Sequence, residues 1–243
     1  MVSDDNHSCD LPQIMNVDLK LDLFSDESDN RTLLNCIDMD PDHNYFTSIT
    51  CDNSYSTPLS LRPKFTSPSL SFSAMHINCR SLLPKLGEIR DLLALLPVSI
   101  LALTETWLDG SSDDAIKVPG YQFVHKPRGG HGGRVAFLIK DDISFQLLDH
   151  SKHNLPSSSY EGLFISVSHK RGTTLMGVIY RPPGHNLDEF SNEIDFLLSE
   201  ILKKNKEVLL LGDFNIDLLK VNNHKVTTNF YNCMTAHHFL PVI

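Results

Sequence analysis

The residue types that could do chemistry lie where apolar segments of the sequence end. Gly212-Asp213-Phe214-Asn215 directly follows the apolar run 208–211, which is expected to form a buried strand. Open α/β sheets place their functional groups in the loops that follow their strands. Here Asp213 could orient or deprotonate a water molecule while Asn215 donates a hydrogen bond to a phosphate oxygen. This pair is therefore a candidate for the hydrolysis of a phosphate ester.

Three further segments supply groups that such hydrolysis needs. Asn78 and Glu105 each follow a predicted strand, and their side-chain oxygens suit a divalent cation such as Mg2+ or Mn2+. Tyr180 and Arg181 end another predicted strand and could bind the phosphate together. Phosphodiester hydrolysis needs a cation that neutralises the phosphate, a base that activates water and donors for the charged oxygens. The segments together offer all three.

Each segment taken alone also has a structural explanation. Asn78 could cap the turn that follows its strand, and Glu105 could form a surface ion pair. Tyr180-Arg181-Pro182-Pro183 could be a stiff strand exit, and Gly212-Asp213-Phe214-Asn215 could be an ordinary turn. Short motifs match by chance. The functional interpretation therefore depends on the joint placement of all four at the C-terminal ends of predicted strands.

The segments that must position these groups alternate between strands and helices. One helix is predicted to begin near Pro84, because proline is tolerated in a first turn. A second is predicted after Asn186, which can act as its N-cap, and a third over 226–234. The irregular alternation predicts a mixed α/β fold with packed sheets. Strands are predicted over 71–77, 98–103, 122–124, 134–139, 163–167, 175–180 and 207–211.

Charge divides the chain into two parts. Residues 1–70 hold twelve Asp or Glu against four Lys or Arg, while residues 71–243 hold eighteen against seventeen. The first part is predicted to be an acidic, Ser- and Pro-containing leader, mostly disordered, because it buries too little apolar surface to offset chain entropy. Its apolar clusters are expected to form transient helices or to dock on a partner. The second part is a near-neutral domain without the strong basic character typical of DNA-binding surfaces. Lys126, Arg128 and Arg134 could form a local basic patch.

The cysteine pattern and the hydropathy of the sequence indicate in which cellular compartment the protein is expected. The five cysteines are scattered and include no Cys-x-x-Cys pair, which argues against a disulfide framework or a structural zinc site and fits a reducing compartment. The N-terminus lacks the basic and apolar blocks of a signal peptide, and no apolar run approaches transmembrane length. The chain is expected to be intracellular and not to associate with a membrane. Nothing in the sequence indicates its oligomeric state.

Taken in order, the motifs of residues 71–243 resemble those of the endonuclease/exonuclease/phosphatase superfamily, which has a DNase I-like fold. Within it, they are most similar to the endonuclease domain of non-LTR (LINE-type) retrotransposons. An ordered set of motifs is more specific than any one of them. The segments that carry the resemblance are His76-Ile77-Asn78-Cys79-Arg80-Ser81-Leu82, Thr104-Glu105-Thr106-Trp107-Leu108, Val118-Pro119-Gly120-Tyr121, Arg134-Val135-Ala136 with its Gly-rich turn, Tyr180-Arg181-Pro182-Pro183 and Gly212-Asp213-Phe214-Asn215.

The resemblance implies a fold, a site and a reaction. The fold would be a four-layer α/β sandwich, with two packed mixed sheets flanked by helices. Asn78 and Glu105 would help to bind Mg2+, and Tyr180 would contact the scissile phosphate. Arg181 would contact the DNA backbone. Asp213 would position the attacking water, assisted by Asn215. The reaction would nick one DNA strand and leave a 3′-hydroxyl for reverse transcription, which implies action in the nucleus.

The sequence departs from the family pattern in two places. Arg134 intervenes between Gly133 and the following Val-Ala, and no Ser-Asp-His motif follows Asp213. On this basis the domain is expected to lack its C-terminal segment, to expose a sheet edge, and to be impaired in catalysis and in stability. Two other functions stay open. One is a non-catalytic retroelement remnant or nucleic-acid-binding module, and the other is a phosphatase of the same superfamily.

Two aromatic residues within the motifs are expected to have structural roles. His76 is expected to pack within its strand rather than to bind a ligand. Trp107 is expected to cover the edge of the sheet rather than to stack on a base.

Overall fold

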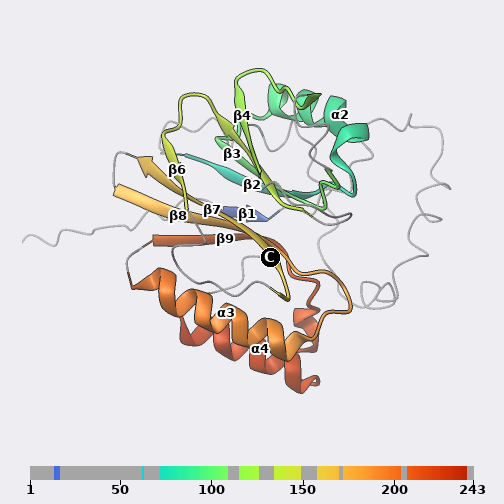
Figure 1. The fold of residues 1–243 in the computed structure, drawn as a ribbon, viewed down its shortest axis with the longest axis vertical. Coiled ribbons are helices and arrows are strands. Elements are labelled where there is room, and N and C mark those ends of the chain that lie inside the picture. The colour runs from blue at the N-terminus through green and yellow to red at the C-terminus, as the bar shows by residue number, and fades with distance from the viewer. Residues whose placement is uncertain are drawn as a thin grey trace, which may run out of the picture.

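Four layers make up the described part of the protein. The structure is a computed structural model that describes residues 14–16, 62, 72–108, 115–125, 134–148, 158–169, 172–203 and 207–239. Two mixed sheets pack face to face, and helices cover their outer sides (Figure 1). This arrangement confirms the predicted four-layer α/β sandwich. Lys126, Arg128 and the Gly-rich turn at 129–133 lie outside the described residues.

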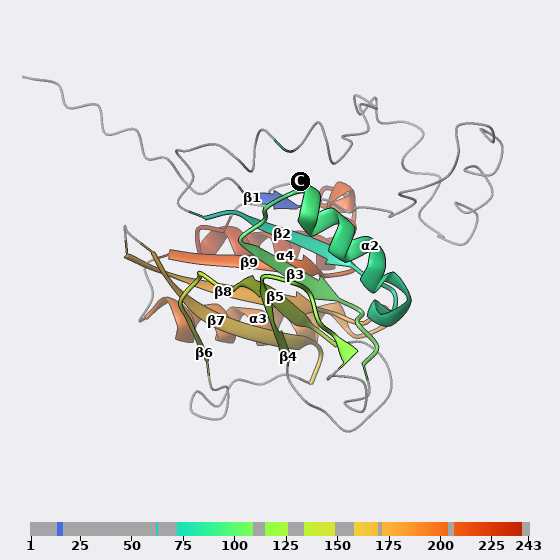
Figure 2. The ribbon, with the colours of Figure 1, turned by 90° about the horizontal axis from the view of Figure 1, so that it is seen from above.

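The first sheet has the strand order β1-β2-β3-β5-β4. Strands β1, β2 and β3 run parallel, whereas β5 is antiparallel to both β3 and β4. Helix α2, Leu82–Leu95, connects β2 to β3 and covers the outer face of this sheet (Figures 1 and 2). The strands are β1 (Ile14–Asn16), β2 (Ala74–Asn78), β3 (Ile100–Thr104), β4 (Tyr121–His125) and β5 (Ala136–Lys140).

Strand β1 comes from the segment that was predicted to be a leader. Its backbone pairs with β2, with Ile14 opposite Ala74 and Asn16 opposite His76. Transient helix was one expectation for the apolar cluster that contains these residues. The structure instead describes this part of the cluster as an edge strand, and Figure 2 shows it beside β2. Apart from Arg62, the rest of residues 1–70 lies outside the described residues.

The second sheet has the strand order β6-β7-β8-β9. Strands β6, β7 and β8 are successively antiparallel, and β9 runs parallel to β8 after a crossover through helix α3. Helices α3 and α4 cover the outer face of this sheet (Figure 1). The elements are β6 (Phe145–Leu147), β7 (Glu161–His169), β8 (Gly172–Tyr180), α3 (Leu187–Leu202), β9 (Glu207–Asp213), the 3-10 turn η4 (Leu218–Lys220) and α4 (Lys225–Ala236).

Three apolar layers hold the sandwich together. One lies between α2 and the first sheet and includes Ile89 and Leu101. The central layer lies between the sheets and includes Phe137 and Ile165. The third lies between the second sheet, α3 and α4, and includes Phe190. Because strands inside the sheets, such as β3 and β8, are covered on both faces, they read as nearly continuous apolar runs, which explains why the sequence pattern located them.

Local signals set the limits of α3. The Asn186 side chain accepts hydrogen bonds from the backbone N–H groups of Asp188 and Glu189, which confirms the predicted N-cap. Inside the helix, Glu193 accepts hydrogen bonds from Ser158 and Ser159 and so fastens the segment before β7 to the helix. In the described part of the chain, no helix combines the length and the apolar character that crossing a membrane requires.

Candidate active site

Four strands deliver the predicted site residues to one end of the sandwich. Asn78, Tyr180 and Asp213 are the last residues of β2, β8 and β9, and Glu105 directly follows β3. The parallel pairing of β8 with β9 puts Tyr180 opposite Asp213. Strands β2 and β3 are also parallel and end at the same level. The strand topology therefore brings together groups that lie far apart in the sequence.

The amide of Asn78 joins the two carboxylates of the site. Its Nδ2 donates to Oε1 of Glu105 and to Oδ2 of Asp213, both at 2.8 Å. Its Oδ1 accepts from the backbone N–H of Arg80 at 3.2 Å. Since Asn78 and Glu105 belong to the first sheet and Asp213 to the second, this one side chain connects the two sheets at their shared end.

Tyr180 adds a hydroxyl to this cluster. It is 6% exposed, and its hydroxyl is hydrogen-bonded to Glu105. Burial, together with the negative charges of Glu105 and Asp213, raises the pKa of Tyr180 to about 12. The phenol therefore keeps its proton at neutral pH and acts as a hydrogen-bond donor.

The last residues of β9 and the tight turn that follows them set the position of Asn215. Gly212 has φ +141°, and a Cβ added there would lie 1.8 Å from the carbonyl oxygen of Ile179, so only glycine fits. The Asn215 backbone N–H donates to Oδ1 of Asp213 at 3.0 Å. Its side-chain Nδ2 donates to the carbonyl oxygen of Arg181 at 2.8 Å. An amide nitrogen carries two N–H groups, so Asn215 has a further donor to offer a ligand.

Arg181 lies beneath this turn rather than on the surface. It is 5% exposed, and its guanidinium also lies over the Phe190 ring, 5.8 Å from the centroid. Nε donates to the carbonyl oxygen of Phe214 at 2.7 Å, Nη1 donates to that of His185 at 2.8 Å, and Nη2 donates to that of Asn215. A contact of Arg181 with the DNA backbone stays a prediction. In the structure, its donors hold the backbone of the turn.

Backbone strain is concentrated in the loops of the site. Five non-glycine residues of these loops have left-handed φ angles: Arg80, Ser81, Glu105, Trp107 and Asn215. Such conformations cost on the order of 1–3 kcal/mol each and persist where the surroundings enforce them, often at functional sites. Backbone hydrogen bonds between these loops enforce the left-handed conformations here, since Ser81 N donates to Glu105 O at 2.8 Å. Apolar periodicity carries no signal for these loop conformations.

The sequence analysis predicted the surroundings of three residues near the site, and their exposed fractions can be compared with those predictions. His76 is 2% exposed and hydrogen-bonded to Thr104 Oγ1 at 3.0 Å, as its predicted packing within the strand requires. Trp107 is 53% exposed, so about half of its side chain faces solvent, and the expectation that its ring covers the sheet edge stays a prediction. Arg134, a candidate for an exposed basic patch, is only 6% exposed. Its backbone N–H donates to Glu161 Oε2 at 2.6 Å.

The donor set fits a hard divalent cation. Glu105 and Asp213 are carboxylates held by a common amide nitrogen, and both are partly exposed. Mg2+ and Mn2+ favour such carboxylate oxygens and usually take one or two of them together with water or phosphate oxygens. Asn78 offers a further oxygen, Oδ1, beside them. The residues present therefore suit the cation that the sequence predicted.

The sequence of the domain identifies its family. Residues 75–237 match the sequence model of the Endonuclease/Exonuclease/phosphatase family. Because this match covers more than half of the chain, the protein belongs to that family. No curated protein matches the chain.

Solved structures share the fold at low sequence identity. The endonuclease domain of TRAS1, a telomere-specific non-LTR retrotransposon, is 11% identical with a TM-score of 0.53, over 68% of this chain and 72% of that chain. The AP endonuclease LMAP from Leishmania major is 15% identical with a TM-score of 0.51, over 68% of this chain and 66% of that chain. At these identities the similarity establishes the fold.

Proposed function

We propose that the site hydrolyses phosphodiester bonds of DNA with the help of a divalent cation, as a nicking endonuclease of the non-LTR retrotransposon type. The observation that carries this proposal is the cluster at the end of the sandwich. One amide, of Asn78, holds the carboxylates of Glu105 and Asp213 within hydrogen-bonding distance of a single nitrogen. Close carboxylates repel each other, and a bound cation offsets that repulsion.

Each residue has a role in this proposal. Glu105 would hold the cation, assisted by Oδ1 of Asn78, and the cation would supply positive charge that offsets the charge of the phosphate. Asp213 orients the attacking water and accepts its proton at a carboxylate oxygen. Tyr180 stays protonated and donates its hydroxyl to a phosphate oxygen when the substrate replaces Glu105 as its partner. Asn215 donates its second side-chain N–H to the same phosphate.

Three observations favour DNA of the retrotransposon kind as the substrate. The fold is similar to that of the TRAS1 endonuclease domain, and the ordered motifs resemble those of LINE-type endonucleases. The exposed ring of Trp107 also lies two residues from Glu105. An aromatic ring at the rim of a nuclease site offers a surface on which an unpaired base can stack.

A sensitive nicking assay tests the proposal. Purified full chain is incubated with supercoiled plasmid in Mg2+ or Mn2+, because conversion of supercoiled to relaxed circles detects a single nick in thousands of bonds. We expect relaxed circles that disappear with a chelator. Asp213→Asn and Glu105→Gln should each lower the rate by about 100-fold or more, since each removes a charge that acts on the reacting groups.

A matched carboxylate serves as the control. Asp141 is an exposed residue in the turn after β5, and β5 runs antiparallel to β3, so this turn lies at the opposite end of the strands from Glu105. Asp141→Asn should nick as the parent chain does. Release of phosphate from small esters without nicking would favour the phosphatase alternative. DNA binding that is unaffected by metal, with no nicking at all, would favour a binding module and contradict the proposal.

A further inference from the structure

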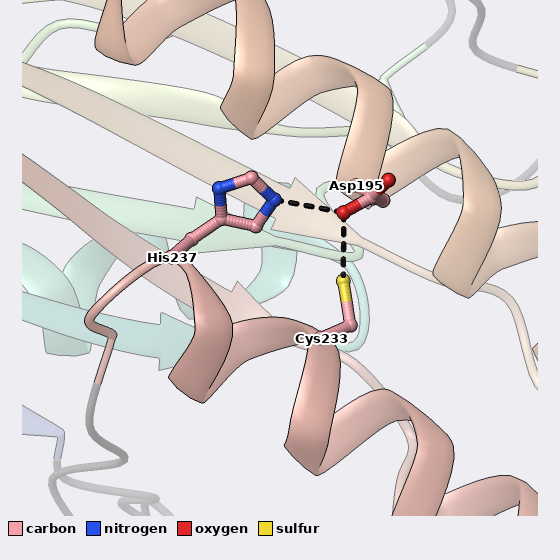
Figure 3. Close-up of side chains that lie close together, drawn as sticks. All are labelled: Asp195, Cys233 and His237. Carbon is pink, nitrogen blue, oxygen red and sulfur yellow. Dashed lines mark hydrogen bonds and ion pairs between the residues drawn. The ribbon is translucent and has the colours of Figure 1, made fainter.

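A cluster of three side chains with metal-binding atoms lies between α3 and α4, away from the strand ends that form the candidate active site. Asp195 projects from α3, Cys233 from α4, and His237 from the C-terminal cap of α4 (Figure 3). Cys233 and His237 are four residues apart, so they share one face of the helix. His237 Nε2 lies 2.8 Å from Asp195 Oδ1, and Cys233 Sγ lies 3.7 Å from the same oxygen.

The atoms of this cluster are close enough to share one ion. One ligand atom from each residue lies within 4.8 Å of the other two. Bond lengths to Zn2+ of about 2.0–2.3 Å separate tetrahedral ligands by about 3.3–3.6 Å. The Sγ–Oδ1 distance is already near this value, and the Nε2–Oδ1 distance needs a modest widening. Rotation of the Asp195 side chain can supply it, because that side chain is 61% exposed.

The chemistry of the three groups selects the ion. Thiolate and imidazole are poor ligands for Mg2+ or Ca2+ but good ligands for Zn2+. A thiolate and a carboxylate together neutralise the two positive charges of Zn2+. Exposure of Asp195 leaves room for a solvent molecule as a fourth ligand, as in other zinc sites with three protein ligands.

We propose that Asp195, Cys233 and His237 form a zinc site that ties α4 to α3. Binding releases the thiol proton and forms one bond each from sulfur, nitrogen and oxygen to the ion. Without the ion, burial and the nearby Asp195 carboxylate raise the pKa of Cys233 to about 11, so the thiol stays protonated at neutral pH. The absence of a Cys-x-x-Cys pair had argued against a structural zinc site. That pattern does not detect ligands that come from two different helices.

The site would steady the packing behind the candidate active site. Phe230 of α4 stacks on Phe190 of α3, with ring centroids 5.7 Å apart. Both rings contact Phe214, each with a centroid distance of 6.0 Å. Phe214 stands between Asp213 and Asn215 in the turn after β9. Fastening α4 to α3 therefore supports the turn that carries two of the proposed active-site residues.

Cobalt provides a direct readout, because a Co2+–thiolate bond gives a charge-transfer absorption that magnesium sites with oxygen ligands lack. The test uses the full chain with Cys9, Cys36 and Cys51 replaced by serine, so that Cys79 and Cys233 are the remaining thiols, and Cys79 is fully buried. We expect a thiolate absorption that corresponds to one Co2+ per chain, loss of that absorption when Zn2+ displaces Co2+, and a Tm that rises with Zn2+ concentration. Cys233→Ser should abolish the absorption.

Further variants distinguish a loss of metal binding from a loss of the folded structure. Asp195→Asn and His237→Gln should each weaken Co2+ binding at least about 10-fold, and Asp195 is exposed enough for its replacement to leave the fold intact. His238→Gln, at the exposed neighbouring histidine, should bind as the background chain does. A chain that gives no thiolate absorption, or an absorption that survives Cys233→Ser, would overturn the proposal. Neither result depends on whether the chain nicks DNA.

Discussion

Asn78 and Asp213 end strands of different sheets, yet Nδ2 of Asn78 lies 2.8 Å from Oδ2 of Asp213. The same nitrogen donates to Glu105 at 2.8 Å. Asn78 thus fixes the separation of two negative charges that would otherwise repel each other. A residue that orients the ligands of a cation in this way affects metal affinity even where it adds little binding energy of its own.

Replacing Asn78 by alanine removes both of these hydrogen bonds. We expect the concentration of Mg2+ that gives half-maximal nicking to rise about 10–100-fold, the range typical of residues that support metal ligands. The measurement is a metal titration of nicking rate. Asn223→Ala, at an exposed turn residue, is the matched control and should titrate like the parent chain. An unchanged Mg2+ dependence in Asn78→Ala would show that the amide does not position the carboxylates.

Arg181→Lys separates a positioning role from a DNA contact. Lysine keeps the charge but cannot reach the carbonyl oxygens of Phe214, Asn215 and His185 together. If the guanidinium positions the turn, kcat should fall about 10–100-fold with KM nearly unchanged, because misplaced groups lose rate rather than affinity.

Salt dependence supplies the second readout for Arg181. The proposed positioning role predicts that Arg181→Met and the parent chain bind DNA with the same dependence on salt concentration. Loss of a phosphate contact would instead lower the slope of log K against log salt by about one. A higher KM in Arg181→Lys together with a lower salt slope in Arg181→Met would support the DNA contact predicted from the sequence.

Two glycines give a paired test of the backbone. Gly212→Ala places a Cβ 1.8 Å from a backbone oxygen at a φ of +141°, so we expect a loss of more than about 3 kcal/mol in the free energy of unfolding. Gly87 lies within α2, and a Cβ there meets nothing within 4 Å. Gly87→Ala should therefore stabilise the chain by about 0.5–1 kcal/mol. Urea unfolding measures both, and equal effects would contradict the strain at Gly212.

The sequence predicted the sandwich because its strands carry strong apolar patterns. Strand β3 is buried at all five positions, and the apolar run 98–103 predicted it. Strand β6 was missed because only three residues form it and two of them are exposed. Strand β1 was missed because its short apolar segment lies in a polar region and is paired only through contacts made far along the chain. Length and burial thus decided which elements could be recognised.

Sequence motifs predicted only part of the candidate active site. Motifs at strand ends located Asn78, Glu105 and Asp213, and the strand topology brings them together. The inward turn of Arg181 was not predictable, because a basic residue beside a strand end more often faces solvent. The cluster around Asp195 also escaped, since its members meet only after α3 and α4 pack against each other. Tertiary contacts, rather than local spacing, define both features.

His76 should make the protein sensitive to mild acid. Burial lowers the pKa of His76 from its ordinary value of 6.5 to about 4. Between these two values the unfolded chain takes up a proton that the folded chain excludes. The stability contributed by the neutral ring is therefore fully present above about pH 6.5 and is lost as the pH falls toward 4. The expected loss from this residue is about 2 kcal/mol at pH 5 and about 3 kcal/mol at the acid limit.

A neutral substitute isolates this contribution. His76→Gln keeps a side chain that can hydrogen-bond Thr104 but removes the titration, so the free energy of unfolding should lose about 2 kcal/mol less between pH 7 and pH 5 than in the parent chain. His238→Gln, at an exposed histidine, should leave the acid sensitivity unchanged. Urea titrations at several pH values above 5 avoid most carboxylate protonation. Parallel pH dependences in His76→Gln and the parent chain would show that this buried ring is not the acid-sensitive group.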